Sequence, residues 1–183
     1  MNWTASAVIA AMVLVGSSLR AAVESRVTEL SLEDGGVQRV LFISPANPSA
    51  ILIMLPGGNG MVDFGAGGTF RDSNFLVRTL PLWQGQGFVA AVLSSPNGMS
   101  LMGVPPHASL HCAIGQAVDF VRSRENLPVW LVGTSQGATA AVGTAARIVG
   151  KIAGIVVMSS ITGRSSAGET LFDSEPGGSP CPC

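Results

Sequence analysis

The sequence predicts an α/β fold, in which a mostly parallel sheet carries helices on both faces and is preceded by an antiparallel hairpin. Short apolar runs alternate with longer segments of helical period along most of the chain. The 23 glycines in 183 residues show no collagen-like period, which is typical of the many tight turns in such folds. Because strand–helix alternation requires crossover connections, the strands after the hairpin are expected to be mainly parallel.

The first strands are expected to form the hairpin and one buried strand. Residues 26–32 and 37–43 contain β-branched residues and are separated by Glu33-Asp34-Gly35-Gly36, a turn-forming cluster. Residues 50–55 are apolar at every position, as expected for a strand that is covered on both faces. This strand stops at the glycine-rich segment 56–60.

The remaining elements alternate between helix and strand. A helix is expected over 74–86, and Pro81 should kink or shorten it because proline lacks the backbone N–H. The elements expected after it are strand 88–93, helix 109–124, strand 128–132, helix 138–149 and strand 154–158. Ligands bind beyond the carboxyl ends of the strands in such sheets, so the loops that begin at Pro56, Ser94 and Gly133 are the candidate binding loops.

Composition argues against several function classes. Only 11% of the residues are charged and the formal net charge is −1, so nothing indicates binding to nucleic acid or to an anionic membrane surface. Two histidines and three cysteines do not form a paired-ligand spacing for zinc. Residues 55–60 lack both the Lys-Ser/Thr ending of a P-loop and the glycine spacing of a dinucleotide site. Neither a metal nor an organic cofactor is therefore expected.

Three segments are expected along the chain: a signal peptide over 1–22, a partial domain of this α/β fold over 23–176, and an unstructured Gly/Pro/Cys tail over 177–183. The apolar run 7–15 is followed by small residues, which favours a cleaved export signal. It is too short to span a bilayer, which takes about 20 apolar residues. Export to the periplasm or the exterior is the expectation, and a buried amphipathic or anchoring helix is the alternative.

The chain has three cysteines, Cys112, Cys181 and Cys183. An exported protein can oxidise two of them. Cys181-Pro182-Cys183 is too tight for an easy mutual bridge, so a disulfide would join one of these two residues to Cys112. Free thiols are the simpler interpretation, and the sequence favours them.

The strongest motif is Gly133-Thr134-Ser135-Gln136-Gly137. It follows a buried strand and opens a helix, and a strained turn in that position lifts the serine oxygen above the edge of the sheet. Gly133 and Gly137 allow the backbones of strand and helix to approach closely. The motif predicts that Ser135 is a nucleophile for an acyl carbonyl, and a helix N-cap is the alternative role.

With this motif the chain resembles the α/β-hydrolase superfamily, especially small carboxylesterases, acyl-thioesterases and dienelactone-hydrolase-like members, over about residues 26–160. The resemblance implies an oxyanion hole made of two backbone N–H groups. Position by position these are the N–H groups of Gln136 and Gly58, with Asn59 as the near alternative. It also implies a small-molecule ester or acyl substrate.

The resemblance does not extend to the partners of the serine. In the superfamily the order along the chain is Ser, then Asp or Glu, then His. No histidine follows Ser135, and Asp173 is the candidate acid among the few later carboxylates. The candidate bases lie upstream, His107 and His111, and His111 could share a helix face with Asp119 at i and i+8.

The sequence therefore predicts an exported serine hydrolase of the ester or thioester class by ancestry, with Ser135 as the acylated residue. The alternative is a catalytically inactive remnant or a non-enzymatic binding protein. The chain is expected to be truncated or frame-shifted near residues 175–176, because no strands that would carry the acid and the base can be recognised. A sheet without those strands would leave an apolar edge and aggregate readily. The oligomeric state is not predicted.

Overall fold

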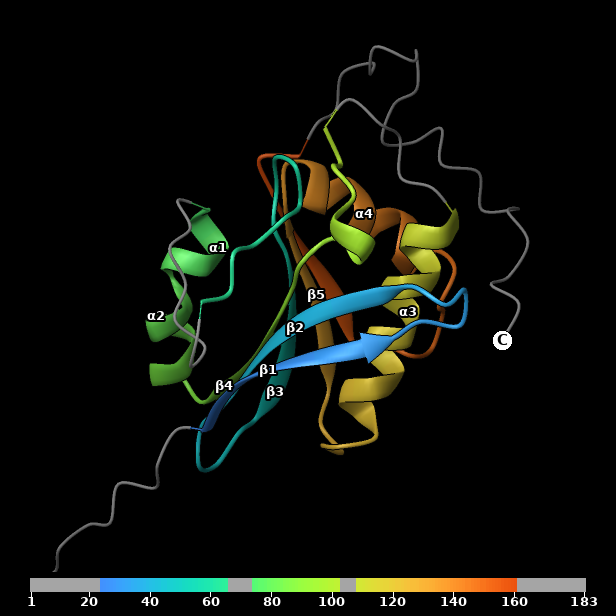
Figure 1. Ribbon diagram of the computed structural model, residues 1–183. Helices are drawn as coiled ribbons and strands as arrows, with labels where there is room; N and C mark the ends of the chain where they lie inside the picture. Colours follow the sequence, from blue (N-terminus) through green and yellow to red (C-terminus); the bar gives the residue numbers. More distant parts are fainter. Residues whose placement is uncertain (1–23, 66–73, 103–107, 161–183) are drawn as a thin grey trace, which may run out of the picture.

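The computed structural model describes residues 24–65, 74–102 and 108–160 (Figure 1). Their strands form one six-stranded sheet in the order β1-β2-β4-β3-β5-β6. The expected signal peptide over 1–22 and the expected tail over 177–183 lie outside the described residues.

An antiparallel hairpin opens the sheet, as the sequence predicts. Strand β1 (Glu24–Ser31) pairs along its length with β2 (Val37–Ser44). Strand β2 then pairs antiparallel with β4 (Phe88–Leu93). The turn is closed by the bond from the N–H of Leu32 to the carbonyl of Gly36, at 2.8 Å. The hairpin is thereby joined to the rest of the sheet through β4.

The other strands are parallel. Strand β3 (Ala50–Leu55) lies between β4 and β5 (Val129–Thr134), and β5 pairs with β6 (Gly154–Met158). Leu55 is opposite Gly133 in this register, so β3 and β5 end side by side. The predicted mixed, mostly parallel sheet is confirmed, and the loops after β3 and β5 meet at one edge.

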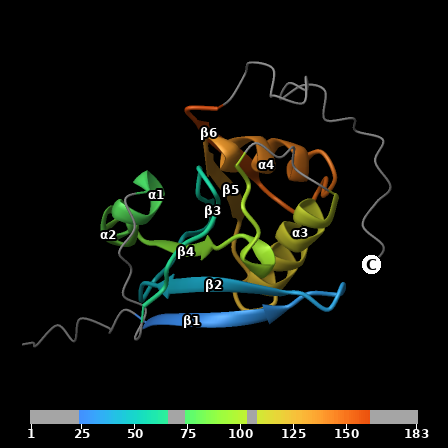
Figure 2. The same cartoon turned by 45° about the horizontal axis from the view of Figure 1, so that its top comes forward.

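One face of the sheet carries two short helices, α1 (Phe75–Arg78) and α2 (Leu80–Gly85) (Figures 1 and 2). The single helix expected over 74–86 is thus broken at Thr79. Pro81 occupies the first turn of α2, where its missing N–H costs no helical hydrogen bond.

The opposite face carries α3 (Ala108–Arg122) and α4 (Gln136–Ala145) (Figure 2). A short 3₁₀ turn, η2 (Pro96–Gly98), follows β4. Helix α4 begins two residues earlier and ends four residues earlier than the expected range 138–149, and α3 matches its expected range closely. Helices on both faces are therefore confirmed.

The core has two parts, one on each side of the sheet. Alternate residues of β3 belong to different parts: Ile51, Ile53 and Leu55 pack towards α3 and α4, and Leu52 and Met54 pack towards α1 and α2. All six residues of β3 are buried, as the unbroken apolar run predicts.

The two outer strands of the described sheet differ in chemistry. Strand β1 carries Arg26 and Glu29, whereas β6 consists of Gly-Ile-Val-Val-Met. The side chains of Ile155, Val156 and Val157 are 36%, 41% and 39% exposed. The described sheet therefore ends in an apolar, uncharged strand. In the described ranges, none of the helices has the length and apolar character needed to cross a membrane.

Candidate active site

Ser135 lies in the sharp turn between β5 and α4. Its φ of 53° and ψ of −120° put a non-glycine residue in a sparsely populated region, which costs about 1–3 kcal/mol. The turn is held by hydrogen bonds from the Ser135 N–H to Met158 O, at 3.0 Å, and from the Ala138 N–H to Ser135 O, at 2.9 Å. Ser135 occupies the N-cap position, but its side chain makes no capping bond. The hydroxyl is therefore not used to cap α4.

The two flanking glycines allow this turn to fit into the sheet. A Cβ on Gly133 would overlap the carbonyl oxygen of Gly137, and a Cβ on Gly137 would overlap that of Leu55. Both obstacles are backbone atoms, which cannot rotate away as the end of a side chain can. The spacing of the motif is thus explained by the close approach of α4 to β3 and β5.

The loop after β3 packs directly against the serine. A Cβ on Gly57 would lie 2.9 Å from the Cβ of Ser135 and 2.7 Å from Thr134 O. Gly58 has a φ of +66° and open space where a side chain would be. Among the described residues, no hydrogen-bond acceptor is found for the N–H of Gly58 or for that of Gln136. Two backbone donors without an acceptor among the described residues therefore lie beside the serine. Their role in an oxyanion hole stays a prediction.

A cleft of about 300 Å³ opens beside Ser135. The described residues that line it carry no charged side chain, and they are Gly57, Gly58, Asn59, Met61, Asn74, Phe75, Thr134 and Ser135. The side chains of Met61 and Phe75 are 41% and 46% exposed. The cleft thus offers a neutral environment with two apolar walls.

The sequence did not indicate that Asn74 and Phe75, at the start of α1, line this cleft. The Asn74 Oδ1 accepts a hydrogen bond from the Leu76 N–H at 3.0 Å, so Asn74 caps the helix and Phe75 follows at its first position. An Asn before an apolar run is a recognisable helix start. It indicates where α1 begins but not that this end faces the cleft.

Four apolar residues of the loops after β3 and β4 are candidates for the cleft wall; Met61 lines the cleft, and Phe64, Met99 and Met102 do not. Phe64 is 4% exposed, its ring lies 5.4 Å from the Arg39 guanidinium, and its carbonyl accepts a bond from Arg39 Nη2. Met99 and Met102 are 38% and 62% exposed and do not line the cleft at Ser135.

His111 is buried between α3 and α4. Its Nδ1 lies 2.9 Å from the Thr144 Oγ1, and its ring packs where Gly143 leaves space. Thr144 follows Ser135 by nine residues, which is about 13 Å along a helix. The structure therefore does not bring His111 to Ser135.

The possibility that His111 and Asp119 share a helix face is wrong. A separation of eight residues rotates a helix position by about 80°, because each residue turns by about 100°. His111 accordingly faces the core, whereas Asp119 is half exposed and pairs with Lys151, at 2.8 Å between Nζ and Oδ2. The other candidates, His107 and Asp173, lie outside the described residues.

Cys112 is disulfide-bonded, which corrects the preference for free thiols. Its partner lies outside the described ranges. Disulfides are typical of proteins from oxidising compartments. Elsewhere in the described residues, no three His, Cys, Asp or Glu side chains are grouped so that they could hold a metal ion.

Several solved structures share this architecture, and esterases and a dienelactone hydrolase are among them. The chain superposes on DcsB, solved with a substrate analogue, with a TM-score of 0.61 and 20% identity, covering 76% of this chain and 46% of that one. On a bacterial brefeldin A esterase it superposes with a TM-score of 0.55 and 21% identity, covering 79% of this chain and 42% of that one. On dienelactone hydrolase from Anabaena variabilis it superposes with a TM-score of 0.60 and 14% identity, covering 75% of this chain and 64% of that one.

The fold is that of the α/β-hydrolases, as the resemblance of the sequence predicts. No protein-family model matches the sequence, and no curated protein is significantly similar to it. The chain spans about half the length of the first structures that it matches. At these identities the likeness establishes the fold, and function must be argued from the site itself.

Proposed function

We propose that this chain is a serine hydrolase of the ester or thioester class in which Ser135 is the residue acylated. The observation that carries the proposal is the strained Ser135 turn beside two unused backbone donors, those of Gly58 and Gln136. Strain at one residue persists only where the surrounding structure enforces it, and such residues cluster at functional sites. The neutral cleft is suited to an uncharged ester.

In the proposed reaction the substrate carbonyl oxygen accepts hydrogen bonds from the N–H groups of Gly58 and Gln136. The Ser135 Oγ attacks the carbonyl carbon and its proton passes to a base. Collapse of the tetrahedral species expels the alcohol or thiol, and water then releases the acid from the acyl-serine. Of the two histidines, His111 is engaged with Thr144, so His107 is the proposed base. Loss of one oxyanion donor costs about 10²–10³ in rate.

Hydrolysis of p-nitrophenyl butyrate and of a butyryl thioester tests this proposal. Wild-type protein should exceed the buffer rate, and Ser135→Ala should reduce kcat by at least about 10³-fold. Ser123→Ala is the matched control, because the exposed Ser123 hydroxyl donates to the carbonyl of Phe120 at 2.8 Å and lies before β5, whereas Ser135 lies after it. Equal turnover by wild type and Ser135→Ala would contradict the proposal.

A non-enzymatic binding protein is the second candidate. It is favoured by one observation: no titratable side chain is among the residues lining the cleft within the described ranges. This candidate predicts saturable binding of an uncharged ester to folded protein without turnover. Chemical-shift changes at Gly57 and Gly58 on titration with ethyl butyrate, together with a rate equal to that of buffer, would favour it over catalysis.

A further inference from the structure

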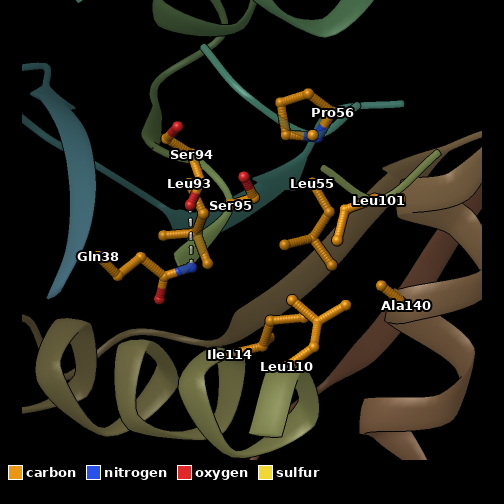
Figure 3. Close-up of a pocket in the computed structure, with 12 residues that line it drawn as sticks. Gln38, Leu55, Pro56, Leu93, Ser94, Ser95, Leu101, Leu110, Ile114 and Ala140 are labelled. Atoms are coloured by element: carbon orange, nitrogen blue, oxygen red, sulfur yellow. Dashed lines mark hydrogen bonds between the residues drawn. The ribbon is translucent and has the colours of Figure 1, made fainter. Parts of the chain in front are cut away.

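The loop that presents Gly58 to the serine is fixed by a second loop. We call residues 56–62 the oxyanion loop and residues 94–101, which follow β4, the bracing loop. The two loops follow neighbouring parallel strands, so they leave the same edge of the sheet. Figure 3 shows the start of each loop, at Pro56 and at Ser94, above the apolar side chains of Leu110 and Ile114 in α3.

Two backbone hydrogen bonds join the loops. The N–H of Ser95 donates to the carbonyl of Gly60 at 2.8 Å, and the N–H of Leu101 donates to the carbonyl of Asn59 at 2.9 Å. Gly60 has a φ of +73°, and a Cβ there would collide with the Leu101 side chain. The bracing loop therefore contacts the residues that immediately follow Gly58.

A third connection runs through side chains. The Ser94 Oγ accepts a hydrogen bond from the N–H of Val62 at 3.1 Å, and this bond is buried. The carbonyl of the same residue accepts from the Gln38 Nε2, also at 3.1 Å and buried (Figure 3). Gln38 comes from β2, so Ser94 joins the hairpin to the oxyanion loop.

Gln38 is an unusual residue for this place in the core. The residue is 1% exposed, and its Oε1 has no hydrogen-bond partner among the described residues. Such an unsatisfied buried acceptor costs about 1–3 kcal/mol. Gln38 lines a small apolar cavity of about 20 Å³ together with Ser95, whose buried Oγ also lacks a partner in the described part of the chain. An apolar residue would fill this position at lower cost, so maximal stability does not explain the amide.

We propose that Ser94 and Gln38 are positioning residues that fix the oxyanion loop, and with it the Gly58 N–H, relative to Ser135. The inference rests on the proposed function, because it assigns that N–H to the oxyanion of the reaction. Ser94 holds the loop through Val62, and Gln38 fixes Ser94 through its carbonyl. A shift of about 1 Å in a catalytic group can cost about 10²-fold in rate.

Steady-state kinetics with p-nitrophenyl butyrate form the first test. Two backbone bonds remain in Ser94→Ala, so we expect kcat to fall about 10-fold with KM unchanged, as for an interaction made mainly in the transition state. Ser94→Thr keeps the hydroxyl and should recover most of the rate. Gln38→Met, which keeps the volume but loses the donor, should resemble Ser94→Ala. Ser123→Ala, which lies outside both loops, should match wild type.

Hydrogen exchange of the full chain, followed by mass spectrometry, tests the brace independently of activity. Peptides covering 56–62 should exchange faster in Ser94→Ala than in wild type, Ser94→Thr or Ser123→Ala. Unchanged exchange would overturn the inference even if the protein is an active hydrolase. Faster exchange with no Ser135-dependent turnover would overturn the proposed function and the assignment to catalysis. A rise in KM with kcat unchanged would also overturn the positioning role.

Discussion

At the scale of single residues, the conformation of Ser135 is the feature that most separates this chain from an ordinary strand–helix connection. A helix that needed only an N-cap would take a serine with extended φ and a hydroxyl bonded to the next turn. Here φ is positive and the capping bond is absent. The conformational cost of this geometry is explained if the hydroxyl must face the cleft.

Replacement of Ser135 should reveal this strain. Both Ser135→Ala and Ser135→Gly remove the hydroxyl, but only glycine adopts a positive φ without steric cost. We expect Ser135→Gly to be more stable than Ser135→Ala by about 1 kcal/mol, measured by urea denaturation. A Gly variant less stable than the Ala variant would show that the turn is not strained.

At the scale of elements, a buried polar contact between His111 and Thr144 joins helices α3 and α4, and His111 has a structural role there. The His111 ring fits against α4 because Gly143 has no side chain, and it contacts the Thr144 hydroxyl. Both side chains are at most 2% exposed. The pair therefore contributes to the packing of the two helices on the sheet.

Removal of the hydroxyl should affect stability and not reactivity. Thr144→Val keeps the shape of the side chain and removes one partner of the imidazole, which should lower the free energy of unfolding by about 1–3 kcal/mol. The rate of p-nitrophenyl butyrate hydrolysis at Ser135 should stay within about twofold of wild type at a temperature where both proteins are folded. A loss of rate comparable to that of Ser135→Ala would instead return His111 to the catalytic candidates.

Elements with strong local signals could be predicted from the sequence. The unbroken apolar run of β3 and the turn residues of the hairpin are read from a few neighbouring residues. The sharp turn at Ser135 also has a local sequence signal, because the strand, the turn and the helix are consecutive in the chain. The rule that ligands bind beyond the carboxyl ends of the strands singled out the loops that begin at Pro56 and Gly133. Gly58 itself was assigned from the resemblance to the α/β-hydrolases.

Features that depend on contacts between distant segments could not be predicted. The burial of Phe64 depends on Arg39, which lies 25 residues away in β2. The burial of His111 depends on the absence of a side chain at Gly143, and the cleft wall at Phe75 depends on where α1 packs. None of these contacts has a local sequence pattern.

At the scale of the whole molecule, the two outer strands of the described sheet differ in their capacity to pair with other chains. Native proteins protect open edges with charges, and β1 does so with Arg26 and Glu29. Strand β6 has no charge and exposes three consecutive β-branched residues. We therefore expect association of this protein to begin at β6.

A charge placed on β6 should suppress this association. Val156→Lys should reduce the concentration-dependent light scattering of purified protein several-fold, because a lysine on an edge strand disfavours strand addition. Val37→Lys is the matched control, since Val37 is 40% exposed but lies in β2, between two paired neighbours. Equal effects of the two variants would mean that net charge, and not the β6 edge, governs association.

The central claim is that Ser135 is an activated nucleophile, and reaction with a fluorophosphonate tests it most directly. Intact-mass analysis of the full chain should show one adduct, and peptide mapping should place it on Ser135. The adduct should be absent from Ser135→Ala and present in Ser123→Ala. Folded wild-type protein that stays unmodified, or that carries the adduct on another residue, would contradict the account.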